Sequence, residues 1–149
     1  MNEKALETLE FNKILTRLVD YADFSASADL ARQLRPTHEL SEARLRQRAT
    51  REACYVLSLD ADVSLQNASD IRPQIGLARR NGVLESSDLL LIKQTLITSR
   101  RLRRTLENLA TEIPHLSRLA EDLPMGLGLV DQINKTISDR GEVLDSASV

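Results

Sequence analysis

A stripe of mostly apolar residues between residues 87 and 110 constrains the fold of this chain more than any other feature. Its members recur every three or four residues and are Leu89, Ile92, Leu96, Ser99, Leu102, Leu106 and Leu109. That spacing places them on one face of an α-helix. Ser86 precedes the stripe as a helix-start residue, and Pro114 ends the run. The sequence therefore predicts one long helix, from Ser87 to about Ala110, with one buried face.

Shorter segments with the same period predict helices before this one. Residues 3–22 carry the pattern, but Phe11 is out of phase with Leu9, which predicts a break between a short helix and a longer one. A second helix is expected from Ser25 to about Leu34, because Pro36 stops it. A third is expected from Ser41 to Leu57, with an inner stripe at Leu45, Ala49, Ala53 and Val56 or Leu57.

Helix-start and helix-stop residues define three further short helices. Asp70 is expected to cap a helix that has Pro73 in its first turn, ends near Arg80 and is terminated by Asn81-Gly82. The other two are expected at residues 115–122 and near residues 127–137. No persuasive strand pattern occurs before Glu142-Val143-Leu144, which can pair across a turn at residues 139–141. We therefore predict an all-α multi-helix bundle in a single helical domain, residues 1–149, with one small β-hairpin near residues 136–145.

Composition limits the classes of function. Aromatic residues make up 3% of the chain and Trp is absent, so a base-stacking platform for single-stranded nucleic acid is not expected. The net charge of −2 argues against a protein that binds polyanions over its whole surface. Cys54 is the only cysteine, which excludes an internal disulfide and favours a reducing compartment, and we expect it to be buried. Without a membrane span or signal peptide, the protein is expected to be soluble and cytoplasmic.

The sharpest charged feature is the run Arg100-Arg101-Leu102-Arg103-Arg104 in the long helix. At about 100° per residue, the face opposite the leucine stripe is expected to carry Lys93, Arg100, Arg101 and Arg104. Arg103 is expected at the edge of the buried side, snorkelling or paired with a carboxylate. Such a face is either a solvated or interdomain surface, which we favour, or a contact for nucleic-acid phosphates.

No motif for catalysis, cofactor binding or metal binding is found in residues 1–149. Gly126-Leu127-Gly128 lacks the Lys-Ser/Thr of a phosphate-binding loop, and no GxSxG or HExxH pattern occurs. We therefore predict no catalytic, cofactor-binding or metal-binding residue in this chain. The last residues include Asp145, Ser146 and Ser148, a helix-start signal without a helix after it. This indicates that the chain is part of a longer protein, cut before a further helix.

Taken in order, several short motifs resemble the second bacterial MutS-like family, a paralogue of mismatch-repair MutS known as MutS type two. The resemblance covers essentially the whole chain. One departure is Arg140, where the family more often has a tighter turn. The motifs are residues 9–15 (LEFNKIL), Tyr21-Ala22, Leu34-Arg35-Pro36, Asp70-Ile71-Arg72-Pro73, Gly82-Val83-Leu84, Ser99-Arg100-Arg101-Leu102 and the tail, residues 139–148.

The resemblance implies that the chain is the N-terminal part of a helical core, or lever, domain. A coiled-coil clamp, an ATPase that uses ATP and Mg²⁺, and commonly a C-terminal Smr nuclease domain would follow. Members are homodimers that act on branched DNA and suppress homologous recombination, and they have been tied to the rescue of stalled ribosomes, with rRNA binding. None of the matching motifs is catalytic, so no catalytic residue is carried over to this chain.

The function expected from the resemblance is a lever that couples the ATPase to the clamp, with the remainder of its own chain as the first partner. Two alternatives stay open at this point. One is a free-standing helical adaptor that binds proteins. The other is an autonomous helix bundle that binds nucleic acid through Arg100, Arg101 and Arg104.

Overall fold

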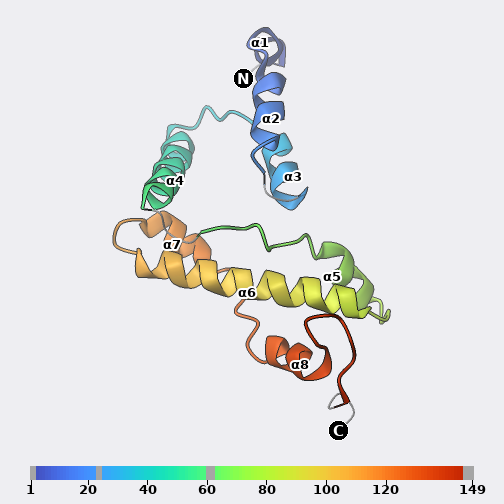
Figure 1. Cartoon of the computed structure of the whole chain (residues 1–149). Coiled ribbons are helices and arrows are strands. Elements are labelled where there is room, and N and C mark those ends of the chain that lie inside the picture. The colour runs from blue at the N-terminus through green and yellow to red at the C-terminus, as the bar shows by residue number, and fades with distance from the viewer. Residues whose placement is uncertain (1–2, 23–24, 60–62, 146–149) are drawn as a thin grey trace.

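The computed structural model describes residues 3–22, 25–59 and 63–145, and in this part of the chain the fold is all-α, as predicted (Figure 1). The helices follow one another without a sheet between them. They are α1 (Glu3–Thr8), α2 (Phe11–Val19), α3 (Ser25–Gln33), α4 (Leu40–Ser58), α5 (Arg72–Arg79), α6 (Ser86–Asn108), α7 (Pro114–Ala120) and α8 (Leu129–Thr136). The predicted ends agree to within about two residues, except that the first segment was expected to reach Ala22 and α2 ends at Val19.

The break between α1 and α2 is where the sequence predicts it. Glu10 adopts the left-handed conformation, with φ of 52°, immediately before Phe11. A helix cannot continue through this conformation, so the direction of the chain changes there. This change of direction accounts for the apolar residues on either side being out of phase.

Helices α1, α2 and α3 form an N-terminal group in which α2 packs against both of its neighbours. Its buried residues are Leu15 from α2 and Ala28 and Ala31 from α3. The alanines are small enough to let α3 lie close to α2. The buried surface of this group is therefore modest, and Leu18, Tyr21 and Leu30 remain exposed around it.

The remaining helices are arranged around α6, which crosses the middle of the molecule (Figure 1). Helices α7 and α8 pack on α6, and α4 packs on α7. A hydrophobic core joins α4, α6 and α7 through Val56, Leu106, Ile113 and Ala120. Ile113 has no exposed surface, because it immediately precedes α7 at the point where α7 folds back on α6.

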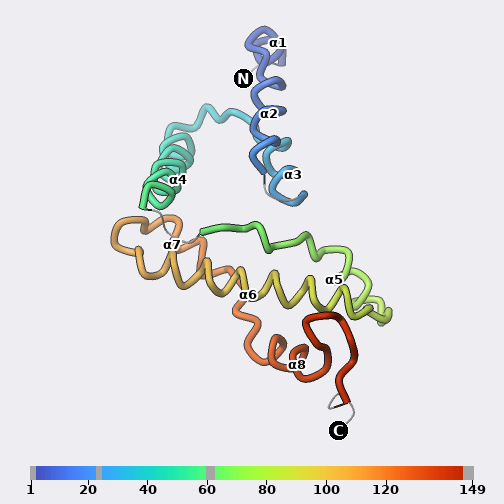
Figure 2. The backbone as a smooth tube through the Cα atoms, in the orientation of Figure 1, coloured from blue at the N-terminus to red at the C-terminus, as the bar shows by residue number. Residues whose placement is uncertain are grey.

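An extended segment, residues 63–71, runs beside α6 and leads to α5 (Figure 2). Polar contacts with Arg101 and Thr95 attach it to α6. The Arg101 guanidinium donates to the Ser64 carbonyl at 3.1 Å, and the Ser69 backbone N–H donates to Thr95 Oγ1 at 3.0 Å. The segment is thus held along the helix although it has no regular structure of its own.

The predicted small hairpin is confirmed by an antiparallel bridge between Ile137 and Val143. Gly141 occupies its turn with φ of 81°. The predicted helix-start signal after it falls largely on Ser146 and Ser148, which lie outside the described residues.

Two expectations for α4 are wrong. Cys54 is exposed, and Leu45 is 47% exposed. The expectation that either Val56 or Leu57 is buried is confirmed, because Val56 is 3% exposed and Leu57 is 69% exposed. The reason is that, among the described helices, only α7 packs extensively on α4, near its C-terminal end. Helical spacing alone predicts one buried stripe along the whole helix, but burial requires a neighbour at each turn.

Candidate functional site: the arginine face of α6 and a polar junction at Asp70

Lys93 does not lie on an exposed basic face, so its predicted position is wrong. It is only 5% exposed, and its Nζ lies 2.6 Å from the Asp139 Oδ1 in the turn of the C-terminal hairpin. The hairpin covers a second side of α6. In a helix that buries only its apolar stripe, this side would be exposed to solvent. Asp139 is itself 94% exposed, and the hydrogen bond and charge of Lys93 lower the pKa of its carboxyl group.

Arg100 lies near the backbone that connects α7 to α8. Its guanidinium donates to the Met125 carbonyl at 3.0 Å and to the Gly126 carbonyl at 3.4 Å. Ser99, on the same helix, donates its hydroxyl to the Pro124 carbonyl at 3.0 Å. These α6 side chains therefore satisfy carbonyl groups of a connection that has no regular structure to satisfy them.

Arg103 continues this row at the edge of the buried face, as predicted. It donates to the Glu121 and Leu123 carbonyls at 2.9 and 3.2 Å and pairs with Glu107 at 2.7 Å. Arg101 binds the segment 63–71, as described above. Arg104 is exposed. The structure thus separates the four predicted contact residues: Lys93, Arg100 and Arg101 make contacts within the chain, and Arg104 faces solvent.

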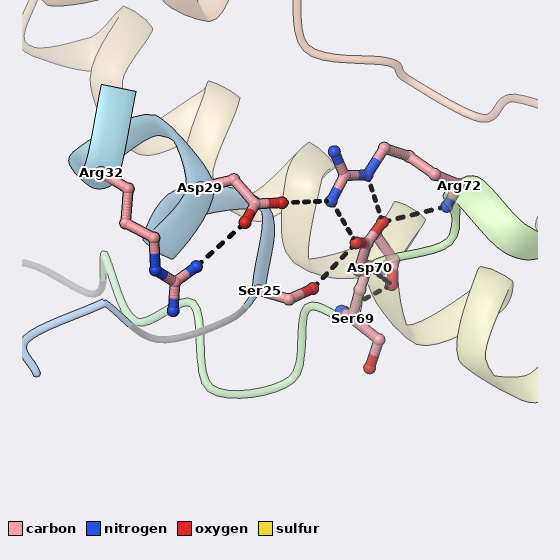
Figure 3. Close-up of polar contacts among 7 residues, drawn as sticks. Ser25, Asp29, Arg32, Ser69, Asp70 and Arg72 are labelled. Carbon is pink, nitrogen blue, oxygen red and sulfur yellow. Dashed lines mark hydrogen bonds and ion pairs between the residues drawn. The ribbon is translucent and has the colours of Figure 1, made fainter. Parts of the chain in front are cut away.

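A second polar cluster joins α3 to the start of α5 (Figure 3). The Ser25 hydroxyl donates to Asp70 Oδ2 at 2.8 Å. The Arg72 guanidinium spans two carboxylates, at 2.5 Å from Asp70 Oδ2 and 3.2 Å from Asp29 Oδ2. Asp29 also pairs with Arg32 at 3.0 Å. We call Ser25, Asp29, Asp70 and Arg72 the polar junction.

Asp70 is the centre of the polar junction. Hydrogen bonds from the Arg72 side chain, the Ser25 hydroxyl and the Arg72 backbone N–H all favour its charged form, so its pKa lies well below the ordinary value. Hydrogen bonds from Arg72 to Asp70 and Asp29 raise the pKa of Arg72 in turn. The Arg72 backbone N–H donates to Asp70 Oδ1 at 3.1 Å. The residue at the N-cap position of α5 is nevertheless Ile71, one residue later than the predicted cap.

The sequence indicated Asp70 as a cap but contained no signal for its contact with α3. Ser25 and Asp70 are 45 residues apart, and neither belongs to a motif that specifies a partner. Glu52 was missed for the same reason. It is 7% exposed and accepts hydrogen bonds from the backbone N–H groups at the start of α7. In the sequence it is one of several charges alternating along a helix.

An apolar groove of about 590 Å³ lies between α5, α6 and α8. Its lining is almost entirely aliphatic, and its titratable side chains are confined to Arg79. It therefore has the character of a packing surface and lacks the grouping of acids and bases that chemistry requires. It is lined by Ile71, Gln74, Ile75, Ala78, Arg79, Leu84, Leu89, Ile92, Leu96, Pro124, Leu129 and Ile133.

A search of residues 3–22, 25–59 and 63–145 finds no cluster of three or more His, Cys, Asp or Glu side chains arranged to hold a metal ion. In the same residues, no helix combines the length and apolar character needed to cross a membrane.

Comparison with known proteins identifies relatives along the whole chain, although no protein-family model and no solved structure matches it. The chain is 34% identical to Endonuclease MutS2 of Brevibacillus brevis over 151 aligned positions, which cover 100% of the chain. Endonuclease MutS2 of Geobacillus kaustophilus is 34% identical over 99% of the chain, and that of Halalkalibacterium halodurans is 31% identical over 98%. The chain spans about 19% of the length of each of these relatives. This similarity, continuous over all of its residues, shows that the chain belongs to the MutS2 family and corresponds to its N-terminal region.

Proposed function

We propose that this chain is the lever segment of a larger MutS2-type protein, in which it couples the state of an ATPase to the position of a DNA-binding clamp. The observation that carries the proposal is the coverage: all of the chain aligns with only 19% of relatives named endonuclease. We infer that the catalytic groups of such a protein lie in its remaining parts and that this segment contributes structure.

The arrangement around α6 supports a mechanical role. This helix has 23 residues and is therefore about 35 Å long. Helices α7 and α8 pack directly on α6. Helix α5 is attached to α6 by the hydrogen bond of 2.9 Å between Gln74 and Asp88. Helices that share one core move as a unit between discrete arrangements, because packed side chains resist gradual deformation. A displacement at one end of α6 would then reach the other.

The same proposal includes the activities expected of the full-length protein. ATP and Mg²⁺ would bind in the ATPase part, and DNA, ribosomal RNA and the second subunit of a homodimer would contact parts outside these 149 residues. Suppression of recombination and rescue of stalled ribosomes would be properties of that assembly. Within this chain, we propose that the exposed side of α6 around Arg104 contacts another part of the protein. Arg100 and Arg101 are already engaged, because they donate hydrogen bonds to backbone carbonyl groups.

The experiment compares the 149-residue chain with a full-length protein that contains it. The chain alone is expected to show neither ATP hydrolysis nor DNA cleavage. In the full-length protein, Ile113→Ala opens a cavity at a fully buried position between α6 and α7. Basal ATP hydrolysis should persist, while its stimulation by branched DNA should be lost.

Ile14→Ala is the matched control, because Ile14 is 57% exposed and its truncation leaves the α6 core intact. Circular dichroism establishes that both variants are folded. The lever role is refuted if the chain alone hydrolyses ATP or cuts DNA. It is equally refuted if folded Ile113→Ala protein keeps the stimulation seen with Ile14→Ala.

A further inference from the structure

The N-terminal group α1–α3 is attached to the rest of the described chain without an extensive helix–helix contact. Of the other helices in the described ranges, all but α5 pack extensively in pairs: α4 with α7, and α6 with both α7 and α8. Inside the N-terminal group, α2 packs on α1 and α3. None of these extensive pairs joins the N-terminal group to the other helices. Its placement therefore depends on its connections at two ends.

One end is the covalent connection, residues 34–39, which is fastened to α4. The Arg46 guanidinium donates to the Arg35 carbonyl at 2.6 Å, and the Thr37 hydroxyl donates to Glu42 at 2.6 Å. Pro36 restricts the backbone between these contacts. This bracing gives the N-terminal group a defined pivot next to the end of α3.

The other end is the polar junction, and the bonds that cross it are few. They are the hydrogen bond from Ser25 to Asp70 and the ion pair between Arg72 and Asp29 (Figure 3). The side chains of Arg72 and Asp29 are 60% and 45% exposed. Ion pairs this exposed are weakened by dissolved salt.

Opening the junction would leave no carboxylate without a partner. Asp29 keeps Arg32 within α3, and Asp70 keeps both the side chain and the backbone N–H of Arg72. The two crossing contacts described above are lost, and water can replace both at this exposed position. The cost of separation is therefore small compared with that of exposing a hydrophobic core.

The closed junction is also connected to α6. Ser69, next to Asp70, donates its backbone N–H to Thr95 in the middle of that helix. The position of α3 is thus transmitted through residues 69–72 to the longest helix of the chain. A change in the junction would alter how the N-terminal group is oriented relative to α6.

We propose that Ser25, Asp29, Asp70 and Arg72 form a releasable polar latch, which holds the α1–α3 group against the start of α5 and lets it pivot at residues 34–39 when it opens. The closed and open states each keep Asp29 and Asp70 paired. The latch is a property of this chain itself and holds whether or not the lever proposal is correct.

Distances between spin labels on the two sides of the latch test the proposal. Arg17→Cys in α2 and Arg79→Cys in α5 provide exposed labelling sites, with Cys54→Ser removing the native thiol. In low salt the labelled chain should give one narrow distance distribution. In about 1 M KCl, where the Debye length is about 3 Å, the distribution should broaden towards longer distances.

The variant Ser25→Ala/Asp29→Asn removes the Ser25 hydrogen bond and the negative charge that Arg72 pairs with on Asp29, and it leaves the pair of Asp70 and Arg72 intact. It should give the broad distribution at both salt concentrations, with unchanged helix content by circular dichroism. Ser41→Ala/Asp20→Asn is the matched control at exposed positions outside the latch and should behave as the unsubstituted chain does. A distribution that does not respond to salt, or a Ser25→Ala/Asp29→Asn variant as narrow as the control, would overturn the latch.

Discussion

The carboxylate of Glu52, in the C-terminal half of α4, accepts a hydrogen bond of 2.8 Å from the backbone N–H of Leu116, in the first turn of α7. The same oxygen accepts the N–H of His115 at 3.0 Å. The first turn of a helix has free N–H groups and partial positive charge, and a buried carboxylate satisfies both. A side chain from one helix thus caps another that is more than sixty positions away in sequence.

Replacing this cap should destabilise the contact between α4 and α7. Glu52→Ala leaves two backbone N–H groups without their acceptor at a site that is 7% exposed, and we expect a loss of about 1–3 kcal/mol. Glu52→Gln keeps an oxygen acceptor and should lose less. Urea unfolding measures both, with the exposed Glu7→Ala as control. Equal stability of Glu52→Ala and Glu7→Ala would contradict the capping role.

Two glycines should respond to alanine in opposite directions. Gly126 has φ of +56°, and an added Cβ would approach Leu96 Cδ1 to 2.9 Å, so Gly126→Ala should destabilise the chain by about 1–2 kcal/mol. Gly76 lies inside α5 with nothing within 4 Å of the added atom. Gly76→Ala should therefore stabilise by about 0.5–1 kcal/mol. Thermal unfolding of the two variants side by side checks this, and shifts of the same sign would refute it.

Two adjacent arginines of α6 should differ in their effect on stability. Arg103 holds the Glu121 and Leu123 carbonyls and Glu107 with a side chain that is 24% exposed. Arg103→Ala should cost about 1–2 kcal/mol, because these carbonyl groups lose a charged donor. Arg104→Ala, at an exposed position, should change stability by less than about 0.5 kcal/mol. Chemical denaturation measures the free energy of unfolding of both variants. A larger loss of stability for Arg104→Ala than for Arg103→Ala would contradict the prediction.

Acid should weaken the hairpin contact between Lys93 and Asp139. The pKa of Asp139 is lower in the folded chain than its ordinary value because Lys93 donates to the carboxylate and adds positive charge. Such a group contributes stability above its unfolded pKa, about 3.9, and that contribution is lost as the pH falls through the lowered value. Asp139→Asn should therefore lower stability at neutral pH and make it decline less in acid.

Denaturation at a series of pH values measures this difference. Asp122→Asn serves as the control, since Asp122 is an exposed carboxylate just after α7. The contact contributes nothing if Asp139→Asn and Asp122→Asn follow the same stability profile between neutral pH and about pH 2.

Sequence periodicity determined the helices of this protein. The break at Phe11, the stop after Arg80 and the long α6 are all local properties, set by the conformations open to a few neighbouring residues. The small hairpin at Ile137 and Val143 was predicted for the same reason, since its turn and its two sides are close in sequence.

Tertiary structure decided which faces of those helices are buried and which charges meet. Lys93 is covered because the hairpin folds back on α6, and Leu45 is exposed because α7 reaches only the far end of α4. The polar junction forms because the fold places Ser25 of α3 within hydrogen-bond distance of Asp70. Burial and charge pairing depend on neighbours that are distant in sequence. Helical periodicity therefore predicts that one face of a helix is buried. It does not predict which element covers that face, or along how many turns.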